Sequence, residues 1–166
     1  MGCDIHLFVE YKKPGWDSWS NFGSQFRLGR HYGVFTSLAG VRSYGDEVKP
    51  VAQLRGIPDG IGYRTRGDYL YFVCENPNED SNETDKERAD KWVAGGSSVW
   101  SGDRHVTDPD AHSMSWLTPD EYDQAINYSL EGRVIHDRED YRALLAAMRS
   151  LEQSGYEVRT VFWFDN

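Results

Sequence analysis

Two Asp-x-His pairs in the sequence combine residue types that bind metal ions or transfer protons. Asp4 and His6 lie in the opening stretch GCDIHLFVE, and Asp110 and His112 lie in DPDAHSMSWLTPDE. Because side chains alternate along an extended chain, each pair would point two polar groups in one direction. Two such pairs could converge on one divalent cation. We therefore expect the four side chains to line one pocket.

Each pair also has an ordinary structural interpretation. His6 could pack on a sheet and donate its ring N–H to Asp4 or a carbonyl group, while Asp110 or His112 could cap a turn. Asp-x-His also opens the metallophosphatase pattern, but the later Asn-His and Gly-His elements of that pattern are missing from the sequence. The sequence does not predict that family.

Serine and cysteine side chains near the two histidines are candidate nucleophiles, but their flanking residues do not match a catalytic motif. Ser113 and Ser115 are not flanked by a G-x-S-x-G nucleophile elbow. Cys3 falls on the apolar side of the opening stretch, so we expect an inert thiol. Without a secretory signal, Cys3 and Cys74 are expected to be reduced rather than paired.

Arginines gather in one part of the chain. From Phe26 to Arg66, seven basic residues stand against three acidic ones, a local charge of +4. Guanidinium groups match phosphate oxygens, and aromatic rings stack on bases. The members that suggest a nucleotide-sized pocket are Arg27, Arg30, Arg42 and Arg55, with Trp16, Trp19, Tyr32 and Tyr44. The alternative is that these arginines pair with the protein's carboxylates. The sequence contains no P-loop and no G-x-G-x-x-G, so an ordinary ATP or NAD site is not supported.

The elements that must position these residues follow from hydrophobic pattern and breakers. Residues 3–11 read as a strand that ends before Pro14-Gly15, and DYLYFVC and YEVRTVFWF read as two more strands. HYGVFTSLAGVR favours a short helix. The following residues 43–67 are too rich in Gly and Pro for a regular element.

Two helices are expected in the C-terminal half. Thr118-Pro119-Asp120-Glu121 is a strong helix start, which predicts a helix to about Leu130. A second helix is expected from near Asp137 to Gly155, with an apolar stripe that includes Tyr141, Leu144 and Met148. Between the two halves, residues 76–96 form a polar acidic excursion that we expect to be mobile or loosely docked, with one helical turn at 87–93.

Together these elements predict an α+β fold in one domain, residues 1–166. We expect a mixed or antiparallel sheet with adjacent N- and C-terminal strands, two helices in the C-terminal half and long irregular loops. The formal charge of −9 argues against sequence-independent nucleic-acid binding. The chain shows neither an apolar run long enough to span a membrane nor a signal peptide, which predicts a cytoplasmic protein. A homo-oligomer is left open.

The chain resembles a family of small bacteriophage and prophage proteins. The likeness lies in the opening MGCDIHLFVE, the middle stretches FTSLAGVR, RGIPD and DAHSMSWLT, and the closing VFWFDN. The positions that carry it are Asp4, His6, Arg42, Arg55, Asp59, Asp110, His112, Ser113 and Trp116. The resemblance implies a phage protein acting in the cytoplasm of an infected bacterium. Phage accessory proteins of this size often counter host defence, in some cases by sequestering a nucleotide second messenger.

Three function hypotheses follow. The leading one is an accessory protein that binds a small anionic, nucleotide-derived ligand through the nine positions just named, with no cofactor and without consuming the ligand. The alternative is a metal-dependent hydrolase or phosphodiesterase in which Asp4, His6, Asp110 and His112 hold a divalent metal. A third is a protein-binding module that uses the acidic excursion to mimic nucleic acid. Whether the protein is an enzyme stays open.

Overall fold

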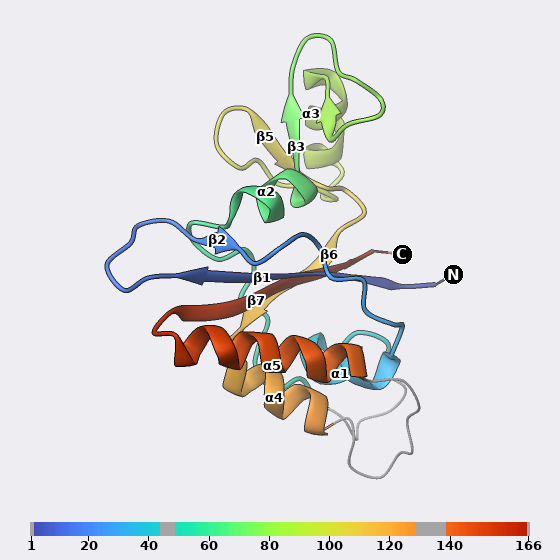
Figure 1. The fold of residues 1–166 in the computed structure, drawn as a ribbon. Coiled ribbons are helices and arrows are strands. Elements are labelled where there is room, and N and C mark those ends of the chain that lie inside the picture. Colours follow the sequence, from blue (N-terminus) through green and yellow to red (C-terminus); the bar gives the residue numbers. More distant parts are fainter. Residues whose placement is uncertain (1, 44–48, 129–138, 166) are drawn as a thin grey trace.

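The computed structural model describes residues 2–43, 49–128 and 139–165, which form two sheets and five helices (Figure 1). The strands are β1 (Asp4–Lys12), β2 (Ser20–Asn21), β3 (Leu70–Val73), β4 (Glu83–Thr84), β5 (His105–Thr107), β6 (His112–Leu117) and β7 (Glu157–Asp165). The helices are α1 (Tyr32–Ala39), α2 (Tyr63–Tyr69), α3 (Lys86–Ala94), α4 (Pro119–Tyr128) and α5 (Glu139–Gln153). The order is β2-β1-β7-β6 in the large sheet and β4-β3-β5 in the small one.

The first and last strands form the centre of the large sheet. They pair antiparallel over their full lengths, from Asp4 opposite Asp165 to Lys12 opposite Glu157. β2 and β6 flank this pair, and both also run antiparallel to their neighbours. The expected α+β class, single domain and adjacent terminal strands are therefore confirmed, with an antiparallel large sheet.

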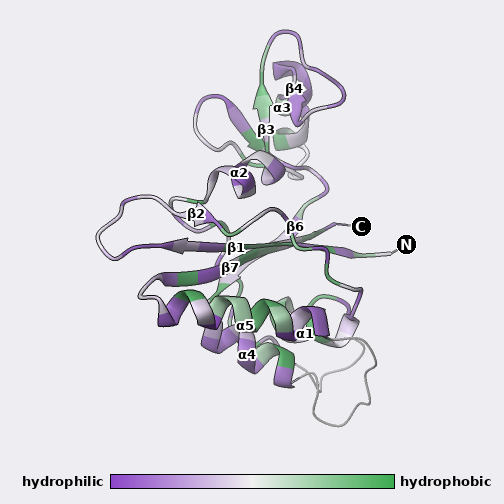
Figure 2. Ribbon diagram, viewed as in Figure 1, coloured by the Kyte–Doolittle hydropathy of each residue, from purple (hydrophilic) through white to green (hydrophobic). Residues whose placement is uncertain are grey.

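One face of the large sheet is covered by α1, α4 and α5 (Figure 1). Ile5, Leu7 and Val9 alternate along β1 and pack with Phe162 and Phe164 of β7 in this core. The same core includes buried residues of each covering helix, and Figure 2 shows green hydrophobic segments where these helices meet the sheet. Alternation buries every second residue of β1 against the helices, so the residues between them must face the opposite side.

The opposite face carries the small sheet, α2 and α3 (Figure 1). Phe8, Val161 and Trp163 form a second buried cluster there with Tyr69 and Leu70, at the junction of α2 and β3. The outer part of this unit is mostly purple in Figure 2, which marks hydrophilic residues. The small sheet, α2 and α3 are thus attached to the large sheet by a small apolar cluster and by polar contacts.

A buried ion pair fixes α2 on this face. Nε and Nη2 of Arg159 donate to one carboxylate oxygen of Glu10 at 2.9 and 2.7 Å. The other oxygen accepts from the Gly62 backbone N–H at 2.7 Å and the Thr65 hydroxyl at 2.6 Å. The Arg159 guanidinium also lies 3.8 Å from the centre of the Trp19 ring. Glu10 therefore joins β7 to the first turn of α2.

Several regular elements lie where the sequence predicts none or only a helical turn, among them the strands β2, β5 and β6. α2 begins within residues 43–67, where the glycine and proline content predicts only loop, and ends at Tyr69 inside the predicted strand DYLYFVC, so the strand β3 begins only at Leu70. The acidic excursion contains β4, which pairs parallel with β3, and α3, whose first turn is capped by Asp85. Asp85 accepts from the Arg88 backbone N–H at 2.8 Å, while Ala89 is fully buried. Much of the excursion is thus regular and docked in the structure, beyond the single helical turn that the sequence predicts.

The long connection from α1 to α2 is anchored by Arg55. Its guanidinium forms a two-pronged ion pair with Glu121 and stacks 4.5 Å from the centre of the Trp116 ring. Glu121 also accepts from the Thr118 backbone N–H at 2.9 Å, which completes the predicted capping box of α4. The predicted ends of the two C-terminal helices that face each other, near Leu130 and Asp137, lie outside the described residues.

Among the helices that the structure describes, none has the length and apolar character needed to cross a bilayer.

Replacing Glu10 by Gln should lower the free energy of unfolding by about 3–5 kcal/mol, because it leaves the Arg159 charge buried without its partner. Chemical denaturation monitored by tryptophan fluorescence measures this change. Glu157→Gln is the matched control, since Glu157 forms a half-exposed pair with Lys12 between the same two strands. That pair should contribute about 1 kcal/mol or less. Equal losses in both variants would contradict the role assigned to Glu10.

Stability should also depend on Glu121 at low pH. The ion pair with Arg55 lowers the pKa of Glu121 from 4.5 to about 2. A depressed folded-state pKa stabilises the protein above the unfolded pKa, and this stabilisation disappears as pH falls from about 4.5 toward 2. Thermal melts of the native protein and Glu121→Gln should differ by about 1–3 kcal/mol at pH 7 and converge at low pH. A constant difference across that range would contradict the ion pair.

Candidate functional site

The two Asp-x-His pairs do not meet in the structure. The His6 ring stacks on Trp163, with centroids 5.2 Å apart, whereas the His112 ring stacks on Phe164 at 6.0 Å. Trp163 and Phe164 are consecutive residues of β7 and belong to the clusters on opposite faces of the sheet. His6 and His112 therefore lie on opposite faces, and the expectation of one shared pocket is wrong.

A backbone irregularity accounts for the position of His112. A bulge lies between His112 and Ser115, and Ser113 within it has a φ of 55°. The Ser113 hydroxyl lies 3.0 Å from Nδ1 of His112, while Nε2 of His112 is buried and has no hydrogen-bond partner among the described residues. Asp110 is exposed in the turn before β6, where its backbone N–H donates to Asp108 at 2.9 Å.

The predicted metal site is therefore not formed by Asp4, His6, Asp110 and His112. Because His6 and His112 are separated by the sheet, one ion could not bind both. In the part of the chain that the structure describes, no group of three or more His, Cys, Asp or Glu residues is placed to hold a metal. Asp4 is instead bonded by Arg30, whose Nη2 donates to it at 2.6 Å.

The other predicted ligand-binding residues lie in separate places. Arg42, with a φ of 57°, interacts with the buried Cys3 thiol, whose pKa is raised by burial despite that contact. Arg55 and Trp116 form the contact with α4 described above. Asp59 offers its backbone oxygen to Arg159 at 3.2 Å. These residues do not form one pocket, and two of the predicted anion-binding arginines, Arg30 and Arg55, are occupied by carboxylates.

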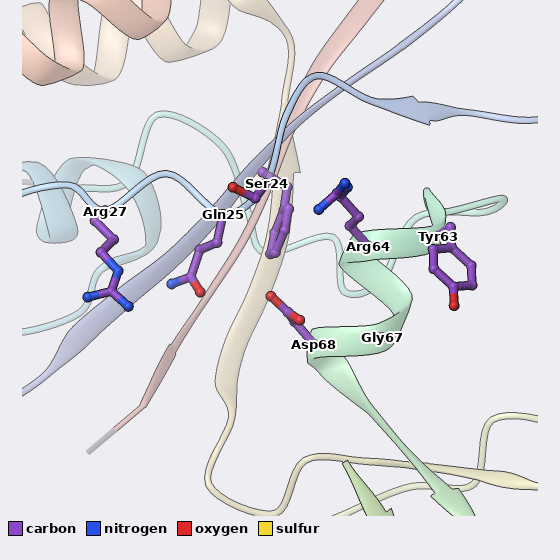
Figure 3. A pocket seen from close by; sticks show the side chains of 8 residues that line it. Ser24, Gln25, Arg27, Tyr63, Arg64, Gly67 and Asp68 are labelled. Atoms are coloured by element: carbon purple, nitrogen blue, oxygen red, sulfur yellow. The ribbon is translucent and has the colours of Figure 1, made fainter. Parts of the chain in front are cut away.

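Two neighbouring pockets beside α2 share part of their lining. One pocket of about 420 Å³ is lined by Phe8, Ser24, Gln25, Arg27, Tyr63, Arg64, Gly67 and Asp68. A second, of about 360 Å³, is lined by Asp4, Ile5, His6, Gln25, Arg27, Leu28 and Asp165. Because Gln25 and Arg27 line both, we treat the two pockets as one site and call it the α2 groove. Figure 3 shows its wider part, with Arg64 and Asp68 projecting from α2 toward the segment that carries Ser24 and Gln25.

The alternation of side chains along an extended segment determines which way Gln25 and Arg27 point. Phe26 donates its backbone N–H to the Leu7 carbonyl of β1 at 2.9 Å, and its ring packs against the helix-side core. The flanking Gln25 and Arg27 therefore face the other way, toward the side of His6 and Phe8. On α2, Arg64 and Asp68 are four residues apart, so they lie on the same side of the helix.

Two positive charges in the α2 groove are unpaired. The guanidinium groups of Arg27 and Arg64 make no hydrogen bond or ion pair with any residue in the described ranges. Loss of hydration raises the pKa of the Asp68 carboxyl, and the same cause raises the pKa of Asp108 near His6. The positive charges of His6 and Arg64 act in the opposite direction on the pKa of Asp68.

His6 is held in a fixed orientation at the narrower end of the groove. Its Nε2 lies 2.9 Å from a carboxylate oxygen of Asp165, and its ring is nearly parallel to Trp163, at 6°. Nδ1 has no hydrogen-bond partner among the residues described. A histidine held in this way could accept a hydrogen bond or a proton from a bound ligand.

Sequence reasoning placed Asp4 and His6 at this site but missed Gln25, Arg64, Asp68 and Asp165 and did not select Arg27 among its final candidates. The spacing of Arg64 and Asp68 is a usable signal only if residues 63–69 are known to be helical. Asp165 follows the closing aromatic strand, and its pairing opposite Asp4 required the register of β1 and β7.

Searches against protein-family models, curated proteins and solved structures found no match to this chain.

Proposed function

We propose that the protein binds a small phosphate-bearing ligand of the nucleotide class in the α2 groove. The observation that carries this proposal is that two unpaired guanidinium groups, Arg27 and Arg64, line one pocket of about 420 Å³. That volume lies in the usual range of roughly 300–1,000 Å³ for small-molecule sites. An arginine fork binds phosphate oxygens through two parallel hydrogen bonds.

The remaining groups in the groove match the other parts of a nucleotide. Gln25 offers both a donor and an acceptor, and the Asp68 carboxyl group can accept from ribose hydroxyls or a base amino group. Tyr63 is 89% exposed, which leaves its ring available for stacking on a base. The finer hypothesis of a phage protein that sequesters a host second messenger stays a prediction, to be tested by which nucleotide binds.

Hydrolysis of the bound ligand is a second candidate function, favoured by the arrangement of His6. With its proton on Nε2 facing Asp165, His6 would use Nδ1 to take a proton from water as the water oxygen attacks phosphorus. The phosphorus–oxygen bond to the leaving group would then break, and solvent would protonate the departing oxygen. In this second candidate function, His6 alone acts as the base, and no metal held by four residues is needed.

Arg27→Ala should weaken ligand binding by about 1.5–3 kcal/mol, because it removes a charge-assisted contact to phosphate. Isothermal titration with AMP, 3′,5′-cyclic AMP and ADP-ribose measures the effect. Arg142→Ala is the matched control, since it removes the same charge from an exposed position on α5, across the sheet from the groove. Equal weakening in both variants, or no binding of any of the three probes, would contradict the proposal.

The same complexes distinguish binding from hydrolysis. We expect chromatography to recover intact ADP-ribose after prolonged incubation, with an affinity that EDTA does not change, because arginines rather than a metal hold the phosphates. Conversion of ADP-ribose to AMP and ribose 5-phosphate that is lost in His6→Gln would instead establish the second candidate. If EDTA abolished the conversion, the result would contradict both binding without turnover and metal-independent hydrolysis by His6.

A further inference from the structure

A second depression lies on the other side of α2. One pocket of about 410 Å³ is lined by Tyr63, Arg66, Gly67, Leu70, Phe72, Ser81, Asn82, Glu83 and His105. Another, of about 370 Å³, is lined by Ile57, Pro58, Asp59, Gly60, Ile61, Arg66, Leu70, Ser101, Gly102 and His105. Because Arg66, Leu70 and His105 line both, we call the pair the Arg66 groove.

The Arg66 groove repeats the chemistry of the α2 groove. The Arg66 guanidinium makes no hydrogen bond or ion pair with a described residue. Burial, and then the charge of Arg66, lower the pKa of His105 and so favour its neutral form. Phe72 is 36% exposed and packs against the His105 ring at 5.5 Å, so an aromatic surface lies beside the unpaired cation. The Glu83 carboxylate is already engaged by the Asn78 backbone N–H at 2.9 Å.

Helix geometry puts one arginine into each groove. Successive residues of an α-helix are rotated by about 100°, so Arg64 and Arg66 point to nearly opposite sides of α2. The ridge between the grooves is formed by Tyr63 and Gly67, which line pockets on both sides. A Cβ atom added at Gly67 would have no other atom within 4 Å, so the ridge is low and open at that residue.

We propose that the protein binds a dinucleotide that crosses α2 at Gly67, with one nucleotide in the α2 groove and the other in the Arg66 groove. Each half meets an unpaired arginine for a phosphate and a neighbouring polar group for the sugar or base. Tyr63 stands at the crossing, where its exposed ring can stack on a base from either half. The proposal rests on the proposed nucleotide-binding function and extends it to a second site.

The test compares AMP with the linear dinucleotide pApA and with cyclic di-AMP by isothermal titration. The dinucleotide of the fitting shape should bind at least about tenfold more tightly than AMP, because a second charge-assisted contact is added without a second association step. Arg66→Ala should reduce its affinity to about that of AMP and leave AMP binding within about twofold. Arg27→Ala should weaken the binding of both AMP and the dinucleotide, whereas Arg142→Ala should weaken the binding of neither.

Gly67→Leu tests the crossing point directly. Gly67 lies inside a helix and needs no positive φ, so leucine is compatible with the backbone and favoured by helix propensity. Its side chain would obstruct the ridge, so dinucleotide binding should fall about tenfold more than AMP binding does, while the melting temperature is retained.

The outcomes separate this inference from the proposed function. AMP binding that depends on Arg27, combined with dinucleotide binding that is no tighter and insensitive to Arg66→Ala and Gly67→Leu, would overturn the second site alone. Failure of AMP and both dinucleotides to bind would overturn both proposals. Tighter binding of a ten-nucleotide oligoadenylate than of either dinucleotide would replace the dinucleotide by single-stranded RNA as the ligand.

Discussion

The buried pair of Glu10 and Arg159 is the interaction on which the rest of the second face depends. Moving two charges out of water costs several kcal/mol for each ion, so such a pair persists only when nearly every polar atom is satisfied. Here Glu10 accepts four hydrogen bonds, two from Arg159 and two from the start of α2. Trp19 covers the guanidinium. The pair therefore acts as a fixed attachment point for α2, and α2 in turn supplies one wall of each groove.

The elements that the sequence predicts well are those whose stabilising signals are local. β1 and β7 show strong apolar patterns, and α4 begins at a capping box that the structure confirms. α2 has no such signal, since Gly67 lowers its helix propensity and its N-cap residue, Gly62, has no side chain to cap the first turn. Its first turn is bonded to Glu10, which is 52 residues earlier in the chain. A contact of this range cannot be deduced from the composition of residues 43–67.

The residues of the candidate site are likewise predicted correctly where the signal is local and wrongly where it is not. Alternation correctly puts Asp4, His6, Phe8 and Glu10 on one face of β1, because a regular strand leaves no other choice. For His112 the same reasoning fails. Without the bulge, Ser113 would lie opposite Phe164 and His112 would share the face of Asp165; the extra residue moves His112 to the helix side. The bulge at the left-handed residue Ser113 thus puts His112 on the helix side, and His6 is the histidine that lines the α2 groove.

The net charge of −9 does not exclude the proposed anion-binding site, because several acidic groups near the large sheet have cationic partners. Arg30 neutralises Asp4, Arg55 neutralises Glu121, and Arg149 bonds three carboxylates of α4 and α5. At physiological salt, charges farther than about 8 Å from a ligand are largely screened. The local balance around α2 therefore matters more than the total, and there Arg27, Arg64 and Arg66 are left without hydrogen-bonded partners among the described residues. Counting arginines along the sequence gives the same weight to structural and available cations. The two kinds separate only when each guanidinium is traced to its partner: Arg55 is bonded to Glu121, whereas the arginines on the two sides of α2 have no such partner among the described residues.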